Sequence, residues 1–186
     1  MRRIFQFNMM TLDGFFAGPA GEIDWHNVDK EFNDFAVEQL KEIGALVFGR
    51  ITYELMAGYW PKPSAVKNDP IVAERMNNLP KVVFSRTLNN VEWNNARLVK
   101  GDAHRELSRL KEGTGKDVAI FGSANLAAGL LEAGLIEELR VMVNPVILGT
   151  GMPLFPNADV RRRVKLLSSR TFRSGNVLLR YEVAAG

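Results

Sequence analysis

The sequence contains no cysteine and only two histidines among 186 residues. Without cysteine, the chain can form neither a disulfide framework nor a thiolate that acts as a nucleophile or metal ligand. His26 and His104 are too few for a histidine-rich metal centre. We therefore expect a protein that uses no metal ion.

Long apolar runs are also lacking. No stretch approaches the roughly 20 apolar residues that a bilayer-spanning helix needs. The N-terminal segment MRRIFQFN includes basic side chains but not the long apolar core of a signal peptide, and it is typical of a first strand. These absences predict a cytoplasmic protein with no membrane partner.

A basic surface that would suit nucleic acid is missing as well. The formal net charge is only +3, and the basic residues are spread along the chain except for Arg161–Arg163 with Lys165. Nucleic-acid binding would need a basic face with interleaved aromatic side chains. We therefore interpret this run as a solvated turn before a C-terminal strand, with DNA or RNA binding as the less favoured alternative. Mild basicity still suits a partner that carries phosphates.

The apolar segments alternate between the patterns of strands and helices. Strands are expected at residues 3–10, 45–48, 81–84, 97–100, 118–121, 138–146, 164–167 and 177–183. Helices are expected at 29–43 (ended by Gly44), after Gly49, at 69–78, and after Asp102 and Ser123, with loops at 15–27, 58–68 and 145–153. This order predicts a single α/β domain over residues 1–186. Its central sheet is mainly parallel, with helices on both faces and an antiparallel edge hairpin that turns at 173–176.

One strand–glycine–helix joint suggests a phosphate site. The apolar run Val118–Phe121 breaks at Gly122, and Ser123 is a good N-cap for the helix-forming segment that follows. Such a joint presents free backbone N–H groups and the positive end of the helix dipole, which suit a phosphate. The alternative is a plain strand–helix connection in which the glycine only eases the turn.

A second joint of the same kind carries an arginine. The strand ending at Phe48 leads through Gly49 into Arg50-Ile51-Thr52. A cation in the first turn of a helix opposes the dipole, and a bound anion would turn that repulsion into attraction. A surface arginine without a ligand is the alternative.

A third strand end supplies another arginine, because Ser85 and Arg86 follow the strand at 81–84. Ligands of open α/β sheets bind outside the carboxyl ends of the strands. Arginine side chains bind phosphate oxygens in pairs, which lysine cannot do. We therefore expect the three strand ends to bind one ligand that carries a pyrophosphate and a further phosphate.

Four segments together resemble a known family. Residues 5–17, 47–54, 119–126 and 143–155 are similar to the dihydrofolate reductase superfamily, and above all to the C-terminal reductase domain of the bifunctional riboflavin-biosynthesis deaminase/reductase and its stand-alone relatives. The resemblance covers essentially the full chain. It implies the dihydrofolate reductase-like fold, a homodimer and NADPH as the hydride donor.

The resemblance also implies which residues bind the cofactor. Arg50 and Thr52 would contact its phosphates, as would the backbone N–H groups of residues 122–126, while Ser85 and Arg86 would face the adenosine 2′-phosphate. The expected cofactor-binding set is Phe48, Gly49, Arg50, Thr52, Ser85, Arg86, Phe121, Gly122, Ser123, Ala124, Asn125 and Leu126.

The substrate side matches the family less well. Dihydrofolate reductases carry a carboxylate on the first long helix, but the corresponding position here is Asn33, so folate reduction is not expected. Asp13, Asp24 or water would supply a proton, although Asp13 could equally cap a turn and Asp24 a helix entry. The substrate pocket is expected to include Trp25, Tyr53 and Trp60, with packing as the alternative role of the two tryptophans.

The resemblance implies an NADPH-dependent reductase of a small-molecule substrate, with hydride transfer to a C=O or C=N carbon. The best-defined reaction of the family reduces 5-amino-6-(5-phosphoribosylamino)uracil. The chain lacks the His/Cys zinc signature of the deaminase, so a different substrate is also consistent with the sequence. The alternative is a non-catalytic nucleotide-binding or regulatory module with the same fold.

Overall fold

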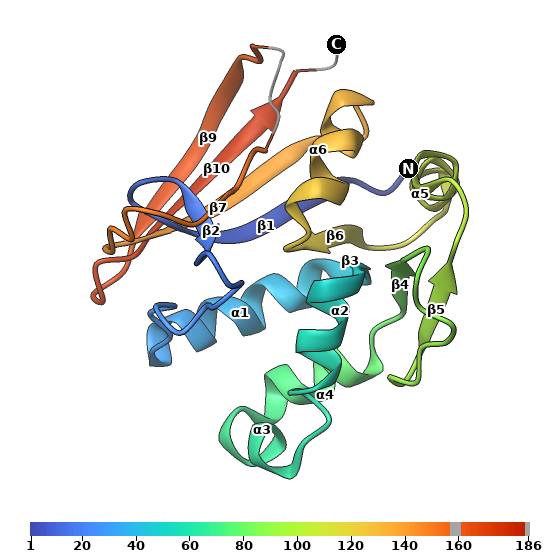
Figure 1. The fold of residues 1–186 in the computed structure, drawn as a ribbon, viewed down its shortest axis with the longest axis horizontal. Coiled ribbons are helices and arrows are strands. Elements are labelled where there is room, and N and C mark those ends of the chain that lie inside the picture. The colour runs from blue at the N-terminus through green and yellow to red at the C-terminus, as the bar shows by residue number, and fades with distance from the viewer. Residues whose placement is uncertain (157–160, 185–186) are drawn as a thin grey trace.

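A computed structural model of the chain describes residues 1–156 and 161–184. Its centre is an eight-stranded sheet in the order β5-β4-β3-β6-β1-β7-β10-β9, and a separate pair is formed by β2 and β8 (Figure 1). The strands are β1 (Ile4–Thr11), β2 (Phe15–Ala17), β3 (Ile43–Gly49), β4 (Lys81–Phe84), β5 (Ala96–Val99), β6 (Asp117–Phe121), β7 (Glu138–Asn144), β8 (Met152–Pro153), β9 (Val164–Thr171) and β10 (Val177–Val183). From β5 to β7 neighbouring strands are parallel, whereas β10 is antiparallel to both β7 and β9.

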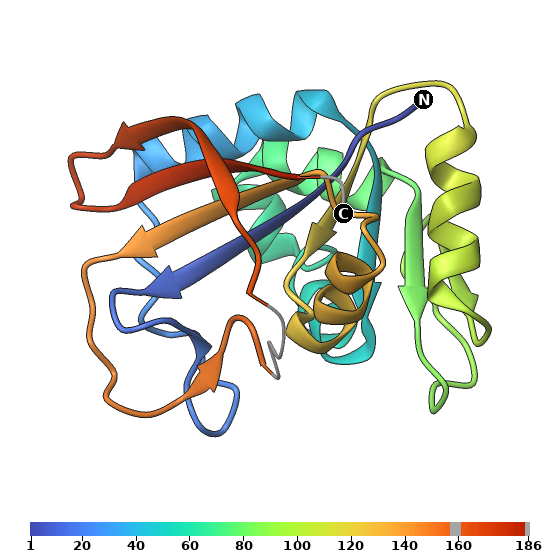
Figure 2. The ribbon, with the colours of Figure 1, turned by 90° about the horizontal axis from the view of Figure 1, so that it is seen from above.

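Helices cover both faces of this sheet (Figure 2). They are α1 (Lys30–Glu42), α2 (Arg50–Ala57), α3 (Pro63–Asn68), α4 (Pro70–Asn78), α5 (Ala103–Glu112) and α6 (Ala124–Glu132). One core cluster joins the sheet to α1, α2 and α4 through Leu40, Tyr53 and Met76, and another joins it to α5 and α6 through Leu107 and Leu130. The predicted α/β class, with its antiparallel edge hairpin, is therefore confirmed.

The first helix begins where the sequence predicts but ends earlier. Asp29 is the N-cap, and its carboxylate accepts a hydrogen bond from the N–H of Phe32. The helix ends at Glu42, because Ile43 already has the extended backbone of β3. Gly44 therefore does not stop the helix. It lies within β3, where a Cβ would come within 3.1 Å of the Lys116 carbonyl oxygen.

Three expected loops contain short elements. Residues 58–68 include α3, which begins with Pro63 in its first turn and buries Ala65. Residues 15–27 and 145–153 contribute β2 and β8, which pair with each other across more than 130 positions of the chain. Elements of two or three residues show no periodicity, and the partner strand supplies the hydrogen bonds that define them. No helix in the described ranges is both long and apolar enough to cross a bilayer.

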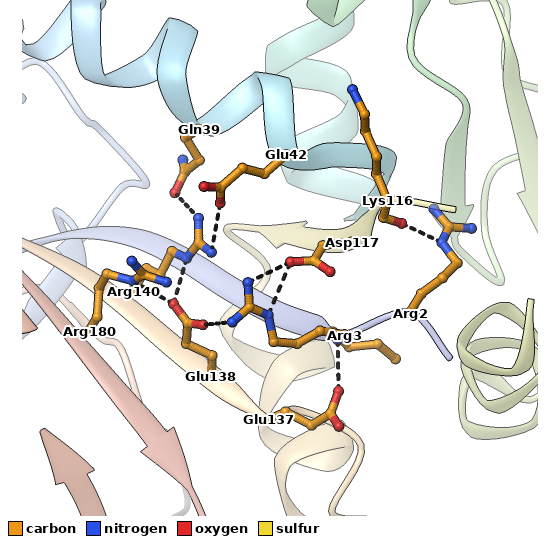
Figure 3. Close-up of polar contacts among 11 residues, drawn as sticks. Arg2, Arg3, Gln39, Glu42, Lys116, Asp117, Glu137, Glu138, Arg140 and Arg180 are labelled. Atoms are coloured by element: carbon orange, nitrogen blue, oxygen red, sulfur yellow. Dashed lines mark hydrogen bonds and ion pairs between the residues drawn. The ribbon is translucent and has the colours of Figure 1, made fainter. Parts of the chain in front are cut away.

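A buried ion cluster lies where the amino ends of β1 and β7 meet β10 (Figure 3). The Glu138 side chain is 1% exposed, and its Oε1 accepts hydrogen bonds of 2.7 Å from Nε of both Arg140 and Arg180. Its Oε2 lies 2.8 Å from a guanidinium nitrogen of Arg3. Arg140 is 3% exposed and stacks over the ring of Phe5, with 3.7 Å between the guanidinium carbon and the ring centre. Each buried charge in this cluster is thus paired, as burial requires.

Lys81 is buried in the core apart from this ion cluster. Its ammonium group donates to the carbonyl oxygens of Asn77, Leu79 and Asn94 at 2.7–3.0 Å and lies 4.4 Å from the ring centre of Trp93. Burial lowers the pKa of Lys81 to about 8. These bonds tie the start of β4 to the end of α4 and to the segment before β5.

Candidate functional site

The three glycine- or arginine-bearing strand ends lie side by side. β3 is flanked by β4 and β6, and all three run parallel. Gly49 is paired with Phe84, the last residue of β4, and Val47 with Ile120 of β6. The carboxyl ends of the strands before Arg50, Arg86 and Gly122 therefore share one edge of the sheet, as the sequence predicts.

The two glycine joints contact each other directly. The N–H of Gly49 donates to Oγ of Ser123 at 2.6 Å, and that hydroxyl donates to Oγ1 of Thr52 at 3.2 Å. A Cβ on Gly49 would lie 2.7 Å from Oγ of Ser123, and one on Gly122 would lie 2.7 Å from Oγ1 of Thr52. Both distances are too short for real contacts, so only glycine permits this approach of α2 to α6.

Ser123 does not cap α6 as the sequence predicts. It occupies the N-cap position, but its φ is +55° and its hydroxyl makes no bond to its own helix. The hydroxyl instead bridges Gly49 and Thr52 of the other joint. Gly49, the N-cap of α2, has no side chain to cap with. Neither helix start is thus closed by a side chain, and their N–H groups stay available to an anion.

Arginines and a depression flank these helix starts. Arg50 is about half exposed, and its guanidinium pairs with Glu54 at 3.0 Å on the surface of α2. Exposed pairs of this kind are weak, so the guanidinium can also reach a ligand. Arg86 is exposed and lines a depression of about 590 Å³ between the ends of β4 and β5. Lys100 and Asp102 line the same depression, although neither is among the site residues predicted from the sequence.

Ser85 shapes the loop after β4. Its Oγ accepts hydrogen bonds from the N–H groups of Thr87 and Leu88 at 3.2 and 3.0 Å. The hydroxyl therefore holds a tight turn that presents Arg86 at the edge of the depression.

The two candidate proton donors differ in their surroundings. Asp13 is exposed, and its carboxylate accepts from the N–H groups of Leu148 and Gly149 at 3.3 and 2.7 Å. Hydrogen bonds from the Thr11 side chain and from these N–H groups hold the pKa of Asp13 below its ordinary value. The carboxylate thus fastens the 146–154 loop and is charged at neutral pH. Asp24 is exposed on the loop before α1.

The three candidate pocket aromatics lie in different places. Tyr53 is buried in the core around α2, and its hydroxyl accepts from the N–H groups of Glu92 and Trp93. Trp60 is half buried against the same cluster, and its Nε1 donates to the Met56 sulfur at 3.2 Å. Trp25 packs against a separate cluster between α1 and the hairpin of β9 and β10.

An aromatic cluster that was not predicted from the sequence joins these regions. Phe7 on β1 contacts Phe121, the residue before Gly122, with ring centres 5.6 Å apart. On its other side Phe7 contacts Phe35 of α1 at 5.9 Å and packs against the cluster that includes Trp25. An alternation such as that of Phe5, Phe7 and Met9 along β1 is typical of a strand with a buried face, but only the fold shows which elements meet there.

Asn33, the position at which dihydrofolate reductases carry a carboxylate, binds a carboxylate from the junction of α3 and α4. Its Nδ2 donates to Oδ1 of Asp69 at 2.8 Å. Asp69 is the N-cap residue of α4, yet its side chain makes no bond to that helix. This contact positions the start of α4 against the first turn of α1.

The aromatic ring of His26 lies beside Trp25, with ring centres 4.5 Å apart. Burial lowers the pKa of His26 to about 4, so the imidazole is neutral at pH 7.

Relatives with similar sequences span nearly the whole chain. YyaP of Bacillus subtilis (strain 168), an uncharacterized protein, is 35% identical over 182 residues, which cover 97% of this chain and 94% of YyaP.

Solved structures share the fold. A putative riboflavin biosynthesis protein from Shewanella sp. PV-4 superposes with a TM-score of 0.74 at 22% identity, covering 98% of this chain and 99% of that one. A deaminase/5-amino-6-(5-phosphoribosylamino)uracil reductase from Thermotoga maritima superposes with a TM-score of 0.70 at 16% sequence identity. The superposition covers 98% of this chain and 57% of the longer protein. Dihydrofolate reductase from Enterococcus faecalis, complexed with NADP(H), superposes with a TM-score of 0.65 at 17% sequence identity. The superposition covers 97% of this chain and 96% of the reductase.

The family is shown by a direct match to the sequence. A model of the RibD C-terminal domain matches residues 2–178, which include both glycine joints, the Ser85-Arg86 turn and the paired strands β1 and β7. This chain belongs to the RibD C-terminal domain family.

Proposed function

We propose that this chain is an NADPH-dependent reductase that transfers hydride to the C=O or C=N carbon of a small heterocyclic or phosphoribosyl substrate. The observation that carries the proposal is the direct contact of the two glycine joints, which places the uncapped starts of α2 and α6 together at one sheet edge. The family supports a reductase-type role. The named activity of the Thermotoga maritima protein suggests 5-amino-6-(5-phosphoribosylamino)uracil as the first substrate to test.

The residues at the joints fit a dinucleotide phosphate. The Ser123 and Thr52 side chains occupy the space that a Cβ on Gly49 or Gly122 would need, so the two glycines keep the uncapped starts of α2 and α6 close enough for one phosphate to accept from both. The donor set combines backbone N–H groups, the Thr52 hydroxyl and the Arg50 guanidinium, all of which favour anions. Arg86 and Lys100 line a depression one strand further along the same edge, where a further phosphate would meet two cations. Asp102 also lines it, but its carboxylate accepts from the N–H groups at the start of α5.

NADPH, when bound, supplies the hydride. In this proposal the chain binds the pyrophosphate with Arg50, Thr52 and the starts of α2 and α6, and binds the 2′-phosphate with Arg86. The aromatic cluster around Phe7 excludes water on the substrate side, next to Trp25. The proton comes from Asp24 or water, because the Asp13 carboxylate has a lowered pKa and already accepts backbone hydrogen bonds.

Replacing Arg50 or Arg86 by alanine is expected to weaken NADPH binding by roughly 10- to 100-fold each, since one charge-assisted hydrogen bond contributes about 1.5–3 kcal/mol. Arg86→Ala should leave NADH binding within about twofold, because NADH lacks the 2′-phosphate. Fluorescence titration of both nucleotides measures these affinities. The exposed Arg75 of α4 is a matched control, and unchanged NADPH affinity in both variants would contradict the cofactor assignment.

Oxidation of NADPH tests the catalytic part of the proposal. Absorbance at the nicotinamide band is followed with 5-amino-6-(5-phosphoribosylamino)uracil, other flavin precursors, pterins and simple ketones. Substrate-dependent loss of the band supports the reductase. NADPH that binds but is consumed with none of these compounds favours the alternative, a nucleotide-binding module that has kept the fold.

The chain is further proposed to form a homodimer through β9. This strand ends the sheet, and all its side chains except that of Arg170 are exposed, including Val164, Leu166 and Leu167. An exposed apolar edge strand is a template for pairing with another chain. The double change Leu166→Glu and Leu167→Glu is expected to convert a dimer to a monomer in sedimentation velocity, whereas Ile147→Glu, at a residue 71% exposed outside β9, should not. A monomeric wild-type chain at micromolar concentration would exclude this dimer.

A further inference from the structure

Three asparagines from distant parts of the chain meet at the loop before α1. The N–H of Asn27 donates to Oδ1 of Asn144 at 2.9 Å, and its Nδ2 donates to the Ser174 carbonyl oxygen at 2.9 Å. Nδ2 of Asn176 donates to the Asn27 carbonyl oxygen at 2.8 Å. Asn27 thus makes hydrogen bonds through its backbone N–H, its backbone carbonyl and its side chain at once.

The partners of Asn27 are rigidly held. Asn144 ends β7, is fully buried, and its Nδ2 donates to the Met142 carbonyl oxygen at 3.0 Å. Asn176 is also fully buried, in the turn between β9 and β10, and its carbonyl oxygen accepts from the N–H of Phe172 at 2.9 Å. The anchors therefore belong to the sheet, whereas Asn27 belongs to a segment with no helix or strand between Ala17 and Lys30.

The segment that these bonds hold also buries polar atoms that lack hydrogen-bond partners in the described part of the chain, which is energetically unfavourable. Among the described residues, buried polar atoms without a hydrogen-bond partner include Nε1 of Trp25, Nε2 of His26, Oγ of Ser174 and Oδ1 of Asn176. A buried unsatisfied polar group favours conformations that expose it to water. The hydrogen bonds of Asn27 therefore offset a cost that this contact would otherwise carry.

We propose that Asn27, Asn144 and Asn176 form a latch that positions the Asp24–Asn27 segment on the substrate side of the site. The latch closes the segment onto the carboxyl end of β7, two strands from β6 and the Gly122 joint. Trp25 packs against the cluster that Phe7 also contacts, and Phe7 contacts Phe121 beside Gly122. The latch residues are positioning residues, and the link to substrate rests on the proposed function.

Asn27→Ala removes one of the three bonds at a half-buried site, and Asn144→Ala removes another at a fully buried one. In hydrogen–deuterium exchange, peptides covering residues 20–29 should exchange about tenfold faster in each variant, the equivalent of one lost hydrogen bond. Peptides covering β3 should not change. The exposed Asn89 is the matched control, and Asn89→Ala should exchange like wild type. If Asn144→Ala does not fold, the exchange rates of Asn27→Ala alone test whether the latch exists.

Kinetics with 5-amino-6-(5-phosphoribosylamino)uracil and NADPH test the positioning. Asn27→Ala should raise the KM for the uracil compound about tenfold, while the Kd for NADPH stays within about twofold. Unchanged exchange at residues 20–29, or faster exchange with an unchanged KM, would overturn the proposal. A wild-type chain that does not bind or oxidise NADPH overturns the proposed function alone, and the exchange rates still decide whether the latch exists.

Discussion

Replacing Glu138 by alanine is expected to lower the free energy of unfolding by about 3–5 kcal/mol, the cost of breaking a buried ion pair by removing one partner. Arg140 is only 3% exposed and would lose its closest carboxylate, and Arg180 would lose the carboxylate that it pairs with. Arg3 would keep its ion pair with Asp117. The Glu42 carboxylate, 53% exposed and 3.1 Å from Arg140, cannot compensate from the surface. Urea denaturation followed by circular dichroism measures the loss.

Glu112 provides the control for this experiment. It is exposed at the end of α5, so Glu112→Ala should change the free energy of unfolding by less than about 0.5 kcal/mol. Equal stability of wild type and Glu138→Ala would show that Arg140 tolerates burial without a partner, contrary to the ion-cluster interpretation.

The lowered pKa of Glu138 also predicts that the stability of the fold depends on pH. Burial alone would raise the pKa of Glu138, but hydrogen bonds from Arg180 and Arg140 outweigh burial and hold the pKa below its ordinary value. A carboxyl whose pKa is lower in the folded chain than in the unfolded one stabilises the fold above its unfolded pKa, and this stabilisation is lost as the pH falls through the folded pKa. Below about pH 4.5, the stability of wild type should therefore fall more steeply than that of Glu138→Gln.

Gly122→Ala is expected to weaken NADPH binding about tenfold or more, the loss of at least one charge-assisted hydrogen bond. Gly122 has a φ of +63°, which costs a residue with a Cβ roughly 1–2 kcal/mol. The new Cβ would also meet Oγ1 of Thr52 at 2.7 Å and Cγ2 at 3.0 Å, so α2 and α6 must separate. Fluorescence titration gives the affinity, and thermal unfolding reports the accompanying strain.

Gly129→Ala separates this effect from a general effect of alanine on α6. Gly129 lies in the same helix and is exposed, and a Cβ at this position would meet no atom within 4 Å apart from those of its own helix. Alanine there should stabilise the chain by about 0.5–1 kcal/mol and leave NADPH binding unchanged. If Gly122→Ala binds NADPH as tightly as Gly129→Ala does, the contact of the two joints is not part of a cofactor site.

The main strands and most helices could be predicted from local pattern. Val118–Phe121 and Ala45–Phe48 are unbroken apolar runs because helices cover both faces of the sheet at β6 and β3. Asp29 and Asp102 cap α1 and α5 through bonds to N–H groups two or three residues away, an interaction that the local sequence specifies. β2 and β8 could not be predicted in this way, since neither persists without the other.

The candidate site likewise has features that the local sequence predicts and features that only the fold decides. That the strand ends before Arg50, Arg86 and Gly122 lie together was predictable, because parallel strands present their carboxyl ends at one edge. That Ser123 bridges Gly49 and Thr52 instead of capping its own helix was not, since the choice depends on a joint more than 70 residues away. The roles of these residues toward NADPH remain predictions.

Residue order and type alone therefore specify where this chain bends, which segments are buried and which strand ends carry anion-binding groups, because those properties depend on neighbours within a few positions. The tertiary structure decides how the buried polar groups are paired. Glu138 meets Arg3 across 135 positions, and Asn27 meets Asn144 and Asn176 across 117 and 149. A buried charge or amide is stable only when such a partner is present, and a partner so distant in the chain is brought into contact only by the complete fold.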